Sequence, residues 1–246
     1  MESRQLEEKS SMDKELIAFL RARGESYRMW EPKLTNWVNG MSDEREKRLL
    51  LNALISGLPI PDDERCLDIG CGFGNLVIAL SEKFASVAGI EVVEERAGWS
   101  QRRCPSAEIV CGTAESLPWA DNSFGLITST DVFEHLDHSQ QAVAAKEIAR
   151  VLKPGGFAFV TVPNIFQIRD EHNHVLLGTW MPNRIRQFIS LKLRGTYIRC
   201  WEHSGSGWGR IFERAGLVVK TVPQRSRTVP VLTSRFHLHL RKPLPR

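Results

Sequence analysis

Three alternate glycines stand directly after a short apolar run, in the stretch LDIGCGFG at residues 67–74. Because glycine has no β-carbon, Gly70, Gly72 and Gly74 let the backbone turn sharply and approach a ligand closely. The next residues, NLVIALSEKF, have the pattern of a helix, whose first N–H groups would face that ligand. A strand, a glycine loop and a helix start in this order indicate a binding site for a nucleoside-type ligand.

The spacing of the glycines disfavours a nicotinamide dinucleotide. The dinucleotide fingerprint GxGxxG would require a glycine at position 75, where the chain has Asn75. The next expected strand, SVAGIE, ends in the acidic residue Glu91. Neighbouring parallel strands end side by side, so this carboxylate would lie near the loop and could accept hydrogen bonds from ribose hydroxyls.

The elements that would position these residues change character along the chain. The first sixty residues look helical, in ELIAFLRAR and KRLLLNALI, and Pro32 interrupts any continuous helix between them. From Glu64 onward short apolar strands alternate with amphipathic helices, which favours a parallel sheet built from βαβ units. We expect five strands, at residues 64–69, 86–91, 107–112, 124–130 and 157–163.

The later elements complete an α/β fold. A helix over QQAVAAKEIARVL should end at the breaker residues 153–156, just before the fifth strand. IFERAG predicts the end of another helix, and LVVKTV and FHLHL predict two final strands. We therefore expect a doubly wound, Rossmann-like, mainly parallel sheet with an N-terminal helical cap and an inserted cap after strand five. The predicted segments are a helical cap (1–60), a Rossmann-like core (61–163), an inserted substrate cap (164–204), and a final helix with C-terminal strands that complete the core (205–246).

The composition is that of an ordinary globular protein, with 42% apolar and 25% charged residues in a chain of 246. No stretch approaches the roughly eighteen uncharged apolar residues of a membrane helix, and the first residues lack the apolar segment of a secretory signal. The five cysteines are odd in number and form no CxxC pair, which indicates reduced thiols. We expect a cytoplasmic protein.

Charge is distributed unevenly. Residues 1–163 hold 18 Lys and Arg against 25 Asp and Glu, whereas residues 164–246 hold 15 against 4. A basic C-terminal surface would suit an anionic small molecule or a lipid-linked glycan at a membrane surface. A solvated cationic face without a ligand is the alternative.

Four motifs together resemble the class I S-adenosylmethionine-dependent methyltransferases, in the small-molecule group that includes the ubiquinone-biosynthesis enzymes. The motifs are LDIGCGFG, GIE, GTAESLPWADNSFGLI and LKPGG, in the family's order and spacing over roughly residues 60–163. The resemblance implies that S-adenosylmethionine is the cofactor and that the three glycines pack under its amino-acid and ribose portions. It also implies that Asp68 orients the methionine amino group and that Glu91 binds the ribose.

The chain departs from the family pattern where adenine would bind. The family usually has an acidic residue at the position of Thr113, so Ala114 and Glu115 would have to supply the contact to the adenine edge. Leu117 and Trp119 would either pack under the loop or form an apolar wall beside adenine. The predicted cofactor-binding set is Asp68, Gly70, Cys71, Gly72, Gly74, Glu91, Thr113, Ala114, Glu115 and Asp131.

Methyl transfer from a sulfonium is an in-line displacement, so the protein has to align the reactants and, where needed, remove a proton. The stretch STDVFEHLDH follows the fourth strand and contains His135, the candidate general base, since histidine accepts a proton near neutral pH. A helix-capping or core histidine is the alternative. Asp131, Glu134 and His135 are also similar to the metal-binding group of the ubiquinone O-methyltransferases, but we expect no metal.

The sequence thus predicts a methyltransferase that acts on a small molecule, at oxygen rather than nitrogen or carbon. The acceptor would be anionic, phenolic or a glycan, and we expect no nucleic-acid partner. Acceptor-binding candidates lie in the two caps: Tyr27, Trp30, His172, His174 and Trp180. The segment FISLKLRGTYIR is a weak candidate for contact with a membrane surface.

Two other classes of function remain open. A nucleic-acid methyltransferase or binder would use the basic segment SRFHLHLRKPLPR, although the chain has no Asn-Pro-Pro-Tyr-like motif after the fourth strand. A non-catalytic assembly protein would keep the fold without the activity. The intact glycines and Glu91 argue against that alternative.

Overall fold

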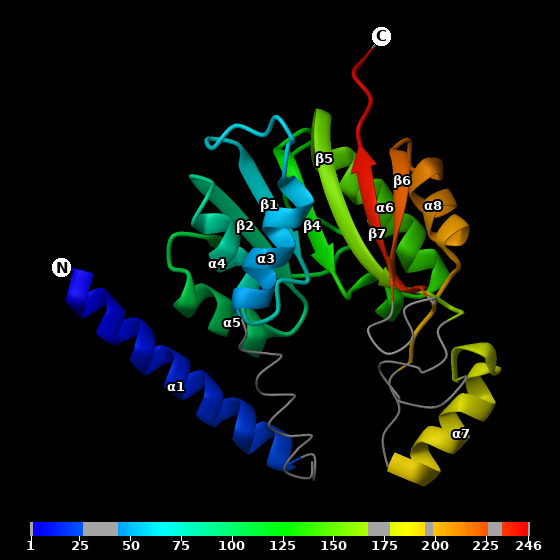
Figure 1. Cartoon of the computed structure of the whole chain (residues 1–246), viewed down its shortest axis with the longest axis horizontal. Helices are drawn as coiled ribbons and strands as arrows, with labels where there is room; N and C mark the ends of the chain where they lie inside the picture. Colours follow the sequence, from blue (N-terminus) through cyan, green and yellow to red (C-terminus); the bar gives the residue numbers. More distant parts are fainter. Residues whose placement is uncertain (1, 27–43, 167–177, 195–198, 226–232, 246) are drawn as a thin grey trace. The chain divides into compact units, whose positions relative to one another are not determined.

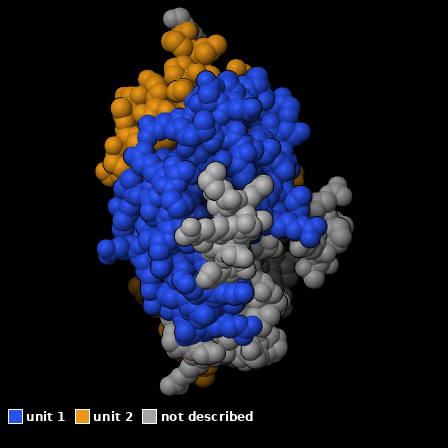
Figure 2. Space-filling view, turned by 90° about the vertical axis from the view of Figure 1, so that its left-hand side faces the viewer, with its two compact units in different colours: residues 1–113 blue, residues 114–246 orange. Residues whose placement is uncertain are grey.

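The computed structural model describes residues 2–26, 44–166, 178–194, 199–225 and 233–245. The chain forms two compact units, residues 1–113 and residues 114–246, which Figure 2 colours separately. Tyr27, Trp30, His172 and His174 lie outside the described residues. None of the helices in the described ranges is long and apolar enough to cross a membrane.

Unit 1 contains three parallel strands in the order β3-β2-β1 (Figure 1). The strands are β1 (Arg65–Ile69), β2 (Ser86–Glu91) and β3 (Glu108–Cys111). They are connected by the helices α4 (Asn75–Ser81) and α5 (Glu94–Arg103). β1 and β2 are buried over almost their whole length, which is typical of parallel strands with both faces covered.

Among the described residues of unit 1, the helices α1 (Glu2–Ser26) and α3 (Glu44–Ile55) precede β1. Leu16 and Leu20 lie four residues apart on one face of α1, and they form a buried apolar cluster with Phe73 and Trp99. The ring of Phe19 lies 5.4 Å from that of Trp99. Through Phe73, α1 packs directly on the glycine loop.

Unit 2 contains four strands in the order β4-β5-β7-β6. β4 (Phe124–Thr130) pairs in parallel with β5 (Leu152–Pro163), while β7 (Thr233–Arg241) lies antiparallel between β5 and β6 (Val218–Arg225). The helices are α6 (His138–Val151), α7 (Asn183–Arg194) and α8 (Gly205–Arg214). Two short 3-10 helices, η1 (Phe133–His135) and η2 (Gly178–Trp180), complete the unit.

All seven expected strands are present, and the largest difference in a boundary is at the start of β5. β5 begins at Leu152, directly after α6, so the breaker residues 153–156 belong to the strand rather than preceding it. They are held there by the chain after β7, because the N–H of Gly155 donates to the carbonyl of Lys242 and the N–H of Lys242 donates to the carbonyl of Gly156. The predicted division into four segments stays a prediction.

Candidate active site

The glycine loop lies between the end of β1 and the start of α4. Gly70, Gly72 and Gly74 adopt positive φ angles of 74°, 55° and 85°. A β-carbon on Gly74 would lie 2.7 Å from Ser100 Oγ and 3.1 Å from Ser100 Cα, whereas one on Gly72 would meet no atom within 4 Å. Gly74 is therefore required for close packing against α5, and Gly72 borders open space.

Glu91, at the end of β2, holds the loop from the side of the neighbouring strand. Its Oε2 accepts a hydrogen bond from the N–H of Gly72 at 3.0 Å, and its Oε1 accepts one from the N–H of Val93 at 3.0 Å. The side chain is 5% exposed. Each carboxylate oxygen has a second lone pair, so Glu91 can fix the loop and still accept a hydrogen bond from a ligand hydroxyl.

Asp68, near the end of β1, and Cys71, within the loop, are both buried. The thiol of Cys71 packs against β2, since a β-carbon on Gly89 would lie 3.0 Å from its sulfur. Burial raises the pKa of the Cys71 thiol, and the negative charge of Asp68 raises it further. The thiol is therefore protonated at neutral pH, and Cys71 can serve a ligand only through its backbone or by shaping the loop.

Arg103, at the end of α5, holds the other side of the loop. Its Nη1 donates to the carbonyl of Phe73 and to Asn75 Oδ1, both at 2.6 Å, and its Nη2 donates to Glu44 Oε1 at 2.7 Å. Only 2% of the side chain is exposed. Desolvation lowers the pKa of Arg103, while the adjacent Glu44 carboxylate acts in the opposite direction.

Sequence reasoning missed Arg103. A basic residue in the last turn of a helix normally serves the helix dipole at the surface, so its type and position do not indicate a buried role. Glu44 lies far away in the sequence, in the first turn of α3. No local pattern links the two residues.

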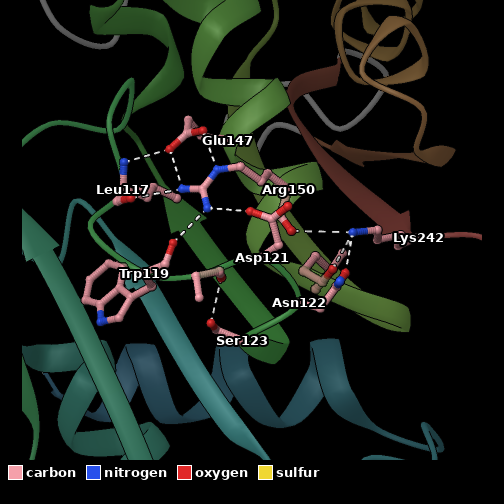
Figure 3. A network of polar contacts seen from close by, with 10 residues as sticks. Leu117, Trp119, Asp121, Asn122, Ser123, Glu147, Arg150 and Lys242 are labelled. Atoms are coloured by element: carbon pink, nitrogen blue, oxygen red, sulfur yellow. Dashed lines mark hydrogen bonds and ion pairs between the residues drawn. The ribbon is translucent and has the colours of Figure 1, made fainter.

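In unit 2, Arg150 on α6 organises the segment in which adenine contacts were predicted (Figure 3). Its guanidinium donates to the carbonyls of Trp119 and Leu117, at 2.7 and 2.9 Å. Glu147 binds the same guanidinium and accepts a hydrogen bond from the N–H of Leu117 at 2.8 Å. The hydrogen bond from Arg150 lowers the pKa of Glu147, so the pair stays charged and keeps the segment in place.

The predicted adenine-edge residues are tied to the start of α6. Gln140 Nε2 donates to Glu115 Oε1 at 2.7 Å, and Gln140 also closes the capping box of α6 with Asp137. Trp119 is buried, with its ring edge-on to Phe124 at 5.3 Å. These contacts support the packing alternative for Trp119.

Asp131 follows β4 and adopts a positive φ of 59°. Its N–H donates to the carbonyl of Thr161, and its carboxylate pairs with Arg235 on β7. Across the residues that the structure describes, no three His, Cys, Asp or Glu side chains are grouped closely enough to hold a metal ion.

His135 is exposed at the end of η1, and the sulfur of Cys200 lies 3.8 Å from its Nδ1. Residues 199–204 lie against η1, where the N–H of Trp201 donates to the carbonyl of Glu134 at 2.7 Å. Gln141 bridges the two segments, since its Nε2 donates hydrogen bonds to the carbonyl of Phe133 in η1 and to the carbonyl of Trp201. The predicted substrate cap thus adjoins the candidate base, through a glutamine that the sequence did not single out.

His203 lies in the same segment and is kept neutral. Its Nε2 lies 2.9 Å from Gln141 Oε1, and its ring packs edge-on against Trp208. Burial lowers the pKa of His203 to about 4, and the positive charges of His138 and Arg210 add to the effect. His203 is therefore a structural residue at neutral pH.

Comparison with known proteins bears on the same residues. The family described as a methyltransferase domain matches residues 67–160, a range that contains the predicted cofactor-binding residues and the candidate base but not the acceptor-binding candidates. Over 165 residues the chain is 27% identical to the uncharacterized methyltransferase sll0829 of Synechocystis sp., covering 67% of this chain and 72% of that one. A solved S-adenosylmethionine-dependent methyltransferase from Methanosarcina mazei aligns with a TM-score of 0.57 at 18% identity, over 80% of this chain and 98% of that one. The family match and these relatives support a class I S-adenosylmethionine-dependent methyltransferase.

Other relatives of this methyltransferase differ in the acceptors in their names. It is 28% identical over 181 residues to the 2-methyl-6-phytyl-1,4-hydroquinone methyltransferase of Synechocystis sp., covering 70% of this chain and 52% of that enzyme. It is 30% identical over 152 residues to the 24-methylenesterol C-methyltransferase 2 of Arabidopsis thaliana, covering 57% and 42%. The alignments with these two relatives therefore cover only about half of each relative's length.

A further solved structure shares the fold. In the complex between the Haloferax volcanii Trm112 methyltransferase activator and a methyltransferase, the matching chain aligns with a TM-score of 0.62 at 16% identity, over 85% of this chain and 93% of that one. The predicted fold class and the predicted cofactor, S-adenosylmethionine, are confirmed. The roles of the individual site residues stay predictions.

Proposed function

We propose that this methyltransferase transfers the methyl group of S-adenosylmethionine to an oxygen atom of a small-molecule acceptor. The observation that carries the proposal is the hydrogen bond from the N–H of Gly72 to Glu91, which supports a site for the methyl donor. It puts a buried carboxylate with spare lone pairs beside a glycine that borders open space.

The residues of the loop fit this cofactor. A β-carbon on Gly72 would point into open space, and this space can hold part of a ligand. Glu91 would accept hydrogen bonds from the ribose hydroxyls, and the buried carboxylate of Asp68 would orient the methionine amino group. When bound, S-adenosylmethionine supplies an electrophilic methyl group on a positively charged sulfur.

His135 would act on the acceptor. Methylation at oxygen removes the proton of a hydroxyl group, and an exposed imidazole that is neutral near pH 7 can accept it. In the tautomer in which Nδ1–H donates to the sulfur of Cys200, Nε2 is the nitrogen that would receive this proton. The name of the hydroquinone methyltransferase supports a phenolic acceptor, and the basic balance of residues 164–246 supports an anionic one.

A cytoplasmic location remains part of the proposal. All five cysteines are free of disulfide bonds, which suits a reducing compartment.

Calorimetric titration with S-adenosylmethionine, S-adenosylhomocysteine and NAD tests the cofactor site. We expect the two sulfur nucleosides to bind and NAD not to bind. Glu91→Ala should abolish binding, whereas Glu108→Ala removes an exposed carboxylate on β3 and should leave it unchanged. Wild-type affinity in Glu91→Ala would remove Glu91 from the site.

Transfer of a labelled methyl group to phenols and anionic sugars then tests the acceptor. Mass spectrometry of the product distinguishes a methyl ether from a methylated carbon. A product methylated at carbon would contradict the oxygen assignment without affecting the cofactor site.

A further inference from the structure

Helix α7 presents an unusual outward face. Ile185, Phe188 and Leu191 are exposed to 51%, 64% and 46%, and they lie at helical spacing. Arg184 and Lys192 are exposed on the same arc, one turn before and one turn after Phe188. The apolar and cationic side chains are therefore interleaved on one surface, which we call the α7 face.

The opposite side of α7 is anchored firmly within unit 2. The guanidinium of Arg186 is buried and donates to Glu202 Oε1 at 2.8 Å and to the carbonyl of Cys200 at 3.0 Å. Ser190, one turn further along, is also buried. The helix is thus held in a defined rotation, and the exposure of the α7 face does not result from a loosely attached helix.

Two further aromatic side chains of unit 2 are exposed. Trp180 lies three residues before α7, is 59% exposed, and contacts the equally exposed Phe166 at 6.4 Å between ring centroids. In Figure 1, α7 lies beyond the ends of the strands of unit 2. Nothing in its sequence, NRIRQFISLKLR, carries a negative charge.

We propose that the α7 face docks this methyltransferase on the surface of an anionic lipid bilayer. Phe, Trp and Leu side chains enter the boundary between headgroups and acyl chains, while Arg and Lys pair with anionic headgroups above it. Helices that lie in the plane of a membrane combine these two groups of residues. The helix is too polar to cross the membrane, so it lies on the surface.

The position of Lys192 distinguishes a bilayer from a protein partner. Its Nζ lies 5.6 Å from the centre of the ring of Phe188, the central apolar side chain of the α7 face. A dry protein interface would bury this ammonium, and lysine is depleted from the core of such interfaces. A headgroup layer instead offers it phosphate oxygens at the same depth as the ring.

Sedimentation with lipid vesicles tests the proposal independently of activity. The full-length protein should bind vesicles of equal parts phosphatidylglycerol and phosphatidylcholine, and not vesicles of phosphatidylcholine alone. Phe188→Glu should abolish binding. Arg184→Gln with Lys192→Gln should weaken it about 25-fold, since each basic residue near an anionic surface strengthens binding about fivefold.

Val218→Glu is the matched control. Val218 is an apolar residue of unit 2 with 61% exposure that lies on β6, away from α7 in the sequence, so this variant should bind as wild type does. Affinity for S-adenosylhomocysteine and the melting temperature report on folding. If Phe188→Glu does not fold, the two glutamine substitutions, which leave the apolar side chains in place, carry the test.

Three results would overturn the proposal. Wild-type protein that does not sediment with anionic vesicles would do so, as would equal losses in Phe188→Glu and Val218→Glu. The third is a dimer in solution that Phe188→Glu converts to a monomer without changing vesicle binding, which would assign the α7 face to a second copy of the chain.

Discussion

Two glycines of the loop, only two positions apart, should respond very differently to the same added methyl group. Gly72 and Gly74 both have positive φ angles, so an alanine at either position adopts a backbone conformation that costs roughly 1–2 kcal/mol. At Gly74 the new β-carbon also lies 2.7 Å from Ser100 Oγ and 3.1 Å from Ser100 Cα. Overpacking of this kind costs about 1–3 kcal/mol, because the backbone of α5 has to move.

We therefore expect Gly74→Ala to lower the free energy of unfolding by about 2–5 kcal/mol and Gly72→Ala by about 1–2 kcal/mol. The effects on ligand binding should be the reverse. The β-carbon of Gly72→Ala enters the space assigned to the cofactor, so we expect the affinity for S-adenosylmethionine to fall roughly tenfold or more, equivalent to about 1.4 kcal/mol.

Urea denaturation and calorimetric titration of both variants measure the two effects. In the background of Gly74→Ala, Ser100→Ala removes the contact with Oγ but leaves the one with Cα, so it should restore only part of the lost stability. Equal loss of stability in the two glycine variants would refute the packing argument. Wild-type affinity in Gly72→Ala would refute the cofactor assignment.

Three further predictions concern charged and titratable groups. Arg103→Met should lower the free energy of unfolding by about 1–3 kcal/mol and weaken cofactor binding, because the carbonyl of Phe73 loses this buried donor, Glu44 loses one of its two arginine partners, and the glycine loop is released. His135→Ala should leave cofactor affinity nearly unchanged and slow turnover roughly 100-fold or more, as expected for loss of a general base. The unfolding free energy should fall as the pH is lowered from 6.5 towards 4, because His203 has a pKa of about 4 when folded and takes up a proton more readily in the unfolded chain.

Each of these predictions has its own control. Glu44→Gln changes the other partner of the same ion pair, so the stability losses of Arg103→Met and Glu44→Gln should not add in the double variant, and strict additivity would contradict the contact. Turnover of His135→Ala equal to that of wild type would exclude it as the base. His203→Gln should reduce the pH dependence of stability without removing it, because burial also lowers the pKa of His237 and His239. An unchanged pH profile in this variant would contradict the neutral state of His203.

Short-range patterns in the chain were sufficient to predict its strands and several of its helices, although not α5 or α7. Apolar runs bounded by polar residues marked all seven strands, and helical periodicity marked α4, α6 and α8. The glycine loop was predictable as a unit, because a strand, three glycines and a helix start follow one another without interruption. The start of β5 was not predictable. Residues 153–156 belong to the strand because they form backbone hydrogen bonds with Lys242, which lies far along the chain.

The sequence by itself therefore determined the order of the elements, the glycine loop and the acidic residue at the end of the second strand. Only the tertiary structure decided how these groups are held: Glu91 by the N–H groups of Gly72 and Val93, and the loop by Arg103. It also decided which face of α7 is buried, through the ion pair of Arg186 with Glu202. Strands, helices and tight turns depend on neighbouring residues, whereas a buried charge is stable only beside a partner that folding brings to it from elsewhere in the chain.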